Sequence, residues 1–214
     1  MNKKLKGLYA ITDAKLMSEN LLNMAEQAIN GGVTILQYRN KTASITQQEQ
    51  EARTLCQLCK KNNVLFIVND DIELATKVNA DGVHLGQKDT QINSARKKLG
   101  PDKIIGITCH NQIELAQQAQ SQGADYIAFG RFYSSLTKPD APAAKLSLLA
   151  EAKKTISIPI VAIGGITSDT APELLEQGAD MLAVIHGIFA QHDVFAASKQ
   201  FVEVMKSIDR PRVY

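Results

Sequence analysis

The chain has 214 residues, a formal net charge of +2, 44% hydrophobic residues and no Trp. This length allows one domain with a large buried core, and the small charge without a basic and aromatic patch predicts no nucleic-acid partner. The basic start Met1–Lys6 precedes a stretch too short and too polar for a signal peptide, and no later segment is long enough to span a bilayer. We therefore expect a cytoplasmic protein without a membrane partner.

Short apolar runs alternate with longer amphipathic segments along the chain. The apolar runs predict eight strands: Gly7–Thr12, Thr34–Arg39, Leu65–Asn69, Gly82–Leu85, Ile104–Thr108, Tyr126–Gly130, Ile158–Gly164 and Met181–Ile185. Segments between and after these runs have apolar residues at helical spacing and predict helices, for example at Asn20–Asn30, Thr46–Lys61, Gln112–Gln122, Pro172–Gln177 and Val194–Ser207. Strands apolar on both faces are typical of a parallel sheet covered by helices. Eight such units predict a single-domain (β/α)8 TIM barrel over residues 1–214, with a doubly wound open sheet as the alternative.

A weak internal repeat favours the barrel. Four related phrases precede the second, fourth, sixth and eighth predicted strands: Asn30-Gly31-Gly32-Val33, Asn79-Ala80-Asp81-Gly82, Gln122-Gly123-Ala124-Asp125 and Gln177-Gly178-Ala179-Asp180. In each phrase a Gly or Asn can adopt the left-handed conformation that ends a helix. The repeat therefore predicts a barrel made of doubled strand–helix units.

The three cysteines do not indicate a disulfide framework. Cys56 and Cys59 form a C-x-x-C motif, but they lie in a segment with helical spacing and no second pair of zinc ligands follows. We interpret them as partly buried helix residues.

Charged residues follow several predicted strands at their C-terminal ends, which a barrel gathers on one rim. Arg39 and Lys41 follow the second strand and supply two cationic groups suited to phosphate. Asp70 and Asp89 follow the third and fourth strands, which are neighbours in a barrel. Two carboxylates with water and substrate phosphate oxygens are the pattern that Mg²⁺ prefers. Asp70 is, however, also placed to cap the helix expected from Ile72 onward.

Glycine-containing turns end the last two strands. Gly164-Gly165 follows the seventh strand, and Ile185-His186-Gly187 follows the eighth. This corner of a TIM barrel often binds phosphate, because glycine leaves backbone N–H groups open to the ligand.

A long polar loop, residues 130–142, follows the sixth strand and predicts a lid at the rim. Lys138 in this loop can neutralise a departing anion, and Ser135 and Thr137 can bind a second substrate. Among the histidines, His84 lies inside a strand and is expected to be an interior, hydrogen-bonded residue. His186 lies near a strand end, where it can contact a ligand.

Six phrases, in order along the chain, resemble the thiamine-phosphate synthase (thiamine-phosphate pyrophosphorylase) family. They are Gly7-Leu8-Tyr9-Ala10-Ile11-Thr12-Asp13, Gln37-x-Arg39-x-Lys41, Val68-Asn69-Asp70, Asp81-Gly82-Val83-His84-Leu85-Gly86-Gln87-x-Asp89, Thr137-Lys138-Pro139-Asp140 and Ala162-Ile163-Gly164-Gly165-Ile166. The resemblance covers almost the whole chain. It implies a (β/α)8 transferase of thiamine biosynthesis, with one Mg²⁺ per subunit, as a monomer or homo-oligomer. Such an enzyme joins 4-amino-2-methyl-5-hydroxymethylpyrimidine diphosphate to 4-methyl-5-(2-phosphoethyl)thiazole, or its carboxylate, and releases pyrophosphate.

The resemblance also implies the roles of individual residues. The pyrimidine diphosphate would be bound by Gln37, Tyr38, Arg39, Asn40, Lys41, Asn69, Thr108 and Lys138. Of these, the catalytic residues would be Arg39, Lys41, Thr108 and Lys138. The thiazole phosphate would be bound by Ser135, Leu136, Thr137, Gly165, Ile185 and His186, and Mg²⁺ by Asp70 and Asp89. The chain departs from the family pattern at three positions: Arg131 replaces a common Pro, Asn40 an acidic residue and His186 a Ser.

The implied reaction needs no protein nucleophile. Cationic groups and Mg²⁺ stabilise the charge on the leaving pyrophosphate, the aminopyrimidine shares the positive charge of its methylene, and the thiazole nitrogen attacks. Three alternatives use the same barrel: a thiazole tautomerase-like paralogue, a non-catalytic phosphate-ligand sensor and a sugar-phosphate isomerase. Retention of Asn69-Asp70, Asp89 and Lys138 favours the synthase over the first, and neither of the others needs Asp70 together with Asp89.

Overall fold

The computed structural model describes residues 5–135, 137 and 142–208. Its eight strands form a closed barrel in chain order, β1-β2-β3-β4-β5-β6-β7-β8, and every neighbouring pair is parallel. The strands are β1 Gly7–Ile11, β2 Ile35–Tyr38, β3 Leu65–Asn69, β4 Gly82–Leu85, β5 Ile104–His110, β6 Tyr126–Phe129, β7 Ile160–Ile163 and β8 Met181–Val184. The predicted (β/α)8 barrel is therefore confirmed, and the open sheet is excluded.

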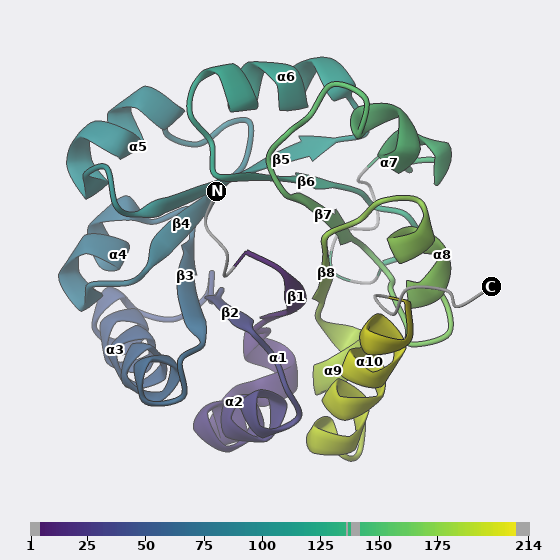
Figure 1. The fold of residues 1–214 in the computed structure, drawn as a ribbon. Helices are drawn as coiled ribbons and strands as arrows, with labels where there is room; N and C mark the ends of the chain where they lie inside the picture. The colour runs from purple at the N-terminus through teal and green to yellow at the C-terminus, as the bar shows by residue number, and fades with distance from the viewer. Residues whose placement is uncertain (1–4, 136, 138–141, 209–214) are drawn as a thin grey trace.

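Helices surround the strands as an outer ring (Figure 1). They are α1 Ala14–Met17, the 3₁₀ turn η1 Ser18–Asn20, α2 Leu21–Asn30, α3 Ile45–Lys61, α4 Ile72–Val78, α5 Ile92–Leu99, α6 Ile113–Ser121, α7 Ser147–Ala152, α8 Ala171–Glu176, α9 His186–Phe189 and α10 Val194–Ile208. The last helix, α10, packs against both α2 and α8 and so closes the ring of helices. Among the described residues, none of these helices has the length and apolar character needed to cross a bilayer.

Apolar side chains pack in two layers because strand residues alternate between the two faces of the barrel wall. In β1, Leu8 and Ala10 pack with the helices, whereas Tyr9 and Ile11 point into the barrel. The interior layer also contains apolar side chains of β2, β3 and β5 to β8, among them the ring of Tyr126. The apolar side chains thus fill the interior of the barrel, and the polar residues lie at the C-terminal ends of its strands.

The repeated phrases end their helices as predicted. Gly32, Asn79, Gly123 and Gly178 have φ of 103°, 54°, 88° and 107°, which is the left-handed region. These residues turn the chain from the helix into the next even-numbered strand.

The repeat has a second role that the sequence did not reveal. In three phrases, an aspartate carboxylate accepts a hydrogen bond of 2.8 Å from a backbone N–H at the start of the preceding strand: Asp81 from Phe66, Asp125 from Ile105 and Asp180 from Ile160. Cations neutralise two of these carboxylates: Arg96 lies 2.7 Å from Asp125, and Lys153 lies 2.6 Å from Asp180. The bonds lie at the N-terminal face of the barrel, which in this fold serves stability rather than catalysis.

Candidate active site

A cavity of about 740 Å³ opens where the C-terminal ends of the strands meet. It is lined by twelve of the predicted site residues: Gln37, Arg39, Lys41, Asn69, Asp70, Asp89, Thr108, Ser135, Thr137, Gly165, Ile185 and His186. Tyr38 and Asn40 are described but do not line it. Leu136 and Lys138 lie outside the described residues, as does part of the predicted lid. The structure therefore brings together clusters that are far apart in sequence.

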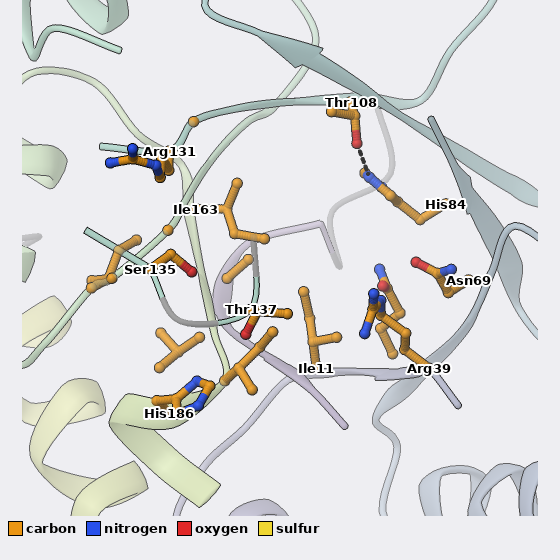
Figure 2. A pocket seen from close by; sticks show the side chains of 18 of the residues that line it. Ile11, Arg39, Asn69, His84, Thr108, Arg131, Ser135, Thr137, Ile163 and His186 are labelled. Carbon is orange, nitrogen blue, oxygen red and sulfur yellow. Dashed lines mark hydrogen bonds between the residues drawn. The ribbon is translucent and has the colours of Figure 1, made fainter. Parts of the chain in front are cut away.

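The cavity has two polar sides separated by apolar side chains (Figure 2). Arg39, Asn69, His84 and Thr108, from the second to fifth strands, lie on one side. Arg131, Ser135, Thr137 and His186 follow the sixth and eighth strands and lie on the other side, and Ile11 and Ile163 stand between them. This division is suited to two ligands that meet in the middle.

On the first side, a lysine and two carboxylates line the same cavity. Lys41 Nζ lies 3.0 Å from Asp70 Oδ2, and Asp89 Oδ2 accepts a 2.6 Å hydrogen bond from the backbone N–H of Gly86. Burial alone raises the pKa of the Asp70 carboxyl, but the Lys41 ammonium group 3.0 Å away outweighs it, and the pKa is lowered overall. Asp70 is therefore ionised at neutral pH, as a metal ligand must be.

The prediction that Asp70 can cap the next helix is wrong. Asp71 is the N-cap of α4, and its carboxylate accepts a 2.9 Å hydrogen bond from the Leu74 N–H. Asp70 has a φ of 61°, and its own N–H donates to His84 O at 2.8 Å. This left-handed turn gives the two adjacent aspartates different partners, so that Asp70 lines the cavity.

Thr12, which the sequence did not single out, holds Arg39 at the rim. Its buried hydroxyl accepts a 2.8 Å hydrogen bond from Arg39 N and donates to Arg39 O at 3.4 Å. The signal in the sequence was a hydroxyl residue directly at the end of an apolar run.

Tyr38 and Asn40 line a smaller adjoining cavity of about 300 Å³ near α3 and α4. Both donate to Glu51 of α3, from Tyr38 Oη at 2.7 Å and from Asn40 Nδ2 at 3.0 Å. Asn40 Oδ1 also accepts from the Thr42 N–H at 3.1 Å. Their side chains therefore shape the loop that carries Arg39 and Lys41, and the direct ligand contact predicted for them stays a prediction.

A hydrogen-bonded chain of five side chains crosses the barrel at the base of the cavity, where Gln37, His84 and Thr108 line it. Gln37 Nε2 donates to Tyr9 Oη at 2.6 Å, and Tyr9 Oη lies 2.8 Å from Tyr126 Oη. Tyr126 Oη lies 3.0 Å from His84 Nδ1, and His84 Nε2 lies 2.8 Å from Thr108 Oγ1 (Figure 2). His84 is thus an interior, hydrogen-bonded residue, as expected. The tyrosines were not singled out, although each is a hydroxyl-bearing residue within an apolar strand.

On the second side, the turn after β7 packs tightly against the loop after β6. Gly164 and Gly165 have φ of 104° and 65°, and a Cβ on Gly165 would lie 2.2 Å from Ser134 O. Glycine is therefore required there by conformation and by space. Thr137 Oγ1 is buried nearby and has no hydrogen-bond partner within the described part of the chain. A buried hydroxyl of this kind is suited to bind a ligand.

Comparison with known proteins agrees with this arrangement. The TMP-TENI family, described as thiamine monophosphate synthase, matches residues 8–188. Thiamine-phosphate synthase of Alcanivorax borkumensis is 53% identical over 201 residues, which is 92% of this chain and 93% of that protein. The enzyme of that name from Thioalkalivibrio sulfidiphilus is 48% identical over 95% of this chain and 97% of its own. The solved thiamine phosphate pyrophosphorylase from Pyrococcus furiosus superposes with a TM-score of 0.89 and 35% identity, covering 97% of this chain and 98% of that chain. The chain belongs to the thiamine monophosphate synthase family.

Proposed function

We propose that this protein is a thiamine-phosphate synthase, which joins the pyrimidine diphosphate to the thiazole phosphate and releases pyrophosphate. The observation that carries the proposal is the two-sided cavity, with cations and carboxylates on one side and a glycine turn with hydroxyls on the other. Relatives that carry this name and match more than nine-tenths of the chain support it.

The donor set of the first side fits Mg²⁺. Asp70 and Asp89 both line the cavity, and the described residues include no group of three or more His, Cys, Asp or Glu side chains that could hold a metal ion. Mg²⁺ typically takes one or two carboxylates and completes its shell with water and substrate phosphate. When bound by Asp70 and Asp89, Mg²⁺ would supply positive charge to the leaving pyrophosphate.

Arg39 and Lys41 would bind the diphosphate of the pyrimidine substrate beside this pair. The Arg39 backbone is fixed by Thr12, and Lys41 is held 3.0 Å from Asp70, so both cations need little reorganisation when charge develops. The bond from the pyrimidine methylene to the diphosphate oxygen breaks, and its electron pair leaves with pyrophosphate. Lys138, which lies outside the described residues, is proposed to assist this departure.

The middle of the cavity would shelter the reacting carbon. The side chains of Ile11 and Ile163 lie between the two polar sides, where they would exclude water from a short-lived cation on the methylene (Figure 2). The lone pair of the thiazole nitrogen then forms the new carbon–nitrogen bond. None of these steps requires a protein nucleophile.

The second side would bind the thiazole phosphate. Thr137 Oγ1 is buried without a partner in the described part of the chain, and Gly165 and His186 line the same side. Ser135 and Ile185 also line the cavity, and Leu136 remains a proposal from the family pattern. The departures Arg131 and His186 both lie on this side, so any difference from relatives is expected in thiazole-phosphate binding.

A pyrophosphate-release assay tests the proposal. We expect release only when both substrates and Mg²⁺ are present, with thiamine phosphate formed in equal amount. A tautomerase-like paralogue or a sugar-phosphate isomerase would release no pyrophosphate, and a sensor would bind the ligands in calorimetry without turnover. Absence of release at saturating substrates and Mg²⁺ would overturn the proposal.

A further inference from the structure

We propose that Glu51 of α3 is a positioning residue that holds Arg39 in place to bind a diphosphate. Arg39 lines the ligand cavity, and Glu51 does not. One carboxylate oxygen, Glu51 Oε2, accepts hydrogen bonds from the side chains of both neighbours of Arg39, from Tyr38 Oη at 2.7 Å and from Asn40 Nδ2 at 3.0 Å. Glu51 therefore acts on a ligand through the segment that carries Arg39.

Arg39 and its two neighbours point to opposite sides of the barrel wall, as consecutive residues of an extended chain do. Tyr38 is buried with the helices and Asn40 bonds to α3, whereas Arg39 lines the cavity (Figure 2). Holding Tyr38 and Asn40 on the helix side thus fixes the direction in which the Arg39 side chain leaves the backbone. One oxygen of Glu51 can hold both neighbours because they lie on the same side, two residues apart.

Two further contacts restrict the backbone around Arg39. From β1, the buried Thr12 hydroxyl accepts a hydrogen bond from Arg39 N at 2.8 Å. From α3, Gln48 Nε2 donates to Asn40 O at 2.8 Å. Gln48 and Glu51 are three residues apart in the helix, so they lie on one face of it, and their bonds show that this face is turned to the loop. The Arg39 segment is therefore held between β1 and α3.

The hydrogen bonds to Glu51 run in one direction. Burial and the bond to Glu51 raise the pKa of Tyr38, so its hydroxyl keeps the proton and donates it. Asn40 Nδ2 is also a donor, because Asn40 Oδ1 is the atom that accepts from the backbone N–H groups of Thr42 and Ala43, each at 3.1 Å. Both side chains thus need the carboxylate as acceptor, and Glu51→Ala leaves two donors without it.

Under the proposed function, on which this step rests, Arg39 binds the diphosphate of the pyrimidine substrate. A guanidinium group binds phosphate through a planar pair of N–H groups, so its direction matters more than that of a point charge. A segment that is already fixed also loses little freedom when the ligand binds. We expect loss of Glu51 to weaken diphosphate binding and to spare the thiazole phosphate, which is proposed to bind on the other side of the cavity.

The first experiment measures how firmly Arg39 is held when no ligand is present. The Arg39 backbone N–H is bonded to the buried Thr12 hydroxyl, so it should exchange slowly with deuterium when followed by NMR. We expect Glu51→Ala to speed this exchange about tenfold or more, and Tyr38→Phe, which keeps the Asn40 bond, to speed it less. An unchanged exchange rate in Glu51→Ala would overturn the proposal, whatever the protein binds. If that variant does not fold, Tyr38→Phe decides the question in the same way.

Glu49 provides the matched control on the same helix. Its carboxylate pairs with Arg53 of α3 at 2.9 Å and with Lys77 of α4. Glu49→Ala removes the same group from the same residue type, and the Arg39 N–H should exchange at the wild-type rate in this variant. Equal acceleration in Glu49→Ala and Glu51→Ala would indicate a general loosening of α3 and would overturn the proposal.

Glu51→Gln tests whether hydrogen bonding or charge is responsible. The described side chains that donate to Glu51 are all neutral: Tyr38, Asn40 and Gln47, the last at 2.8 Å. A glutamine oxygen can accept from Tyr38 and Asn40, and the Gln47 amide can turn to accept from the new NH₂ group. We therefore expect Glu51→Gln to keep most of the wild-type protection of Arg39. An effect as large as that of Glu51→Ala would overturn positioning by these bonds.

The second experiment measures ligand binding, by calorimetry with inorganic pyrophosphate and Mg²⁺ and by steady-state kinetics. We expect Glu51→Ala to raise the pyrophosphate Kd and the KM for the pyrimidine diphosphate about tenfold, the effect of one or two lost neutral hydrogen bonds. The KM for the thiazole phosphate should not change, and an equal rise in both KM values would overturn the positioning role. So would an unchanged pyrophosphate Kd despite faster Arg39 exchange. A wild-type protein that binds no pyrophosphate would instead overturn the proposed function.

Discussion

Replacing Asp70 by glycine should separate the chemistry of the site from the stability of the fold. Asp70 has a φ of 61°, so alanine would be strained there, whereas glycine adopts this conformation readily. Relief of the left-handed conformation gains about 1–3 kcal/mol. The greater freedom of glycine in the unfolded chain costs about 0.5–1 kcal/mol. The ion pair with Lys41, whose two side chains are 58% and 29% exposed, contributes at most about 1 kcal/mol.

These contributions nearly cancel, so the melting temperature of Asp70→Gly should not fall by more than about 4 °C. Turnover should drop by about 100-fold or more, as when one charge-stabilising group is removed from an active site. The assays are pyrophosphate release across a range of Mg²⁺ concentrations and thermal unfolding followed by circular dichroism.

The adjacent aspartate provides the control. Asp71→Ala removes the N-cap of α4, which should cost about 0.5–2 kcal/mol of unfolding free energy, but it removes nothing from the main cavity. We expect this variant to melt at a lower temperature and to turn over normally at 25 °C. Near-normal turnover of Asp70→Gly at saturating Mg²⁺, or equal loss of turnover in both variants, would refute the reasoning.

Three further outcomes follow from the packing and the charges. Gly165→Ala places a Cβ 2.2 Å from Ser134 O, and we expect steady-state kinetics to show a KM about tenfold or more higher for the thiazole phosphate, with little change for the pyrimidine diphosphate. Asp125→Ala leaves the Ile105 N–H without its acceptor and should lower the unfolding free energy in urea by about 1–3 kcal/mol, with turnover unchanged. Burial raises the pKa of Cys109 to about 12, so its thiol should resist iodoacetamide at pH 8 until the protein unfolds; rapid labelling of the native protein would contradict this.

The barrel was predictable because its strands are uniformly apolar and its helices end in recognisable phrases. Each strand was found, with ends shifted by at most two residues, and β5 extends to His110 beyond the predicted Thr108. The meeting of Arg39, Lys41 and the two carboxylates followed from topology alone, since a barrel brings every strand end to one rim.

Other features of the site could not be predicted, because they depend on backbone and side-chain geometry that the spacing of residues in the sequence does not determine. Nothing in the pattern around Asp70 and Asp71 distinguishes the helix cap from the cavity residue, because this depends on one left-handed φ. Tyr9 and Tyr126 are 117 residues apart in sequence, and the position of the Tyr126 ring requires the small residue Gly106 on a third strand. Local patterns report which face a residue occupies but not which distant group it meets.

The aspartates at the lower face of the barrel tie together strands that follow one another in the chain. Asp81 joins the β3–β4 unit, Asp125 the β5–β6 unit and Asp180 the β7–β8 unit. In β1–β2 the same position is served by Thr34, whose hydroxyl donates to Lys6 O at 2.7 Å. Each two-strand unit therefore has its own side-chain hydrogen bond between its strands. Because the chain between the bonded residues is short, forming this bond closes a small loop and costs little conformational entropy. A circularly permuted chain whose new ends lie between two of these two-strand units would keep all four hydrogen bonds.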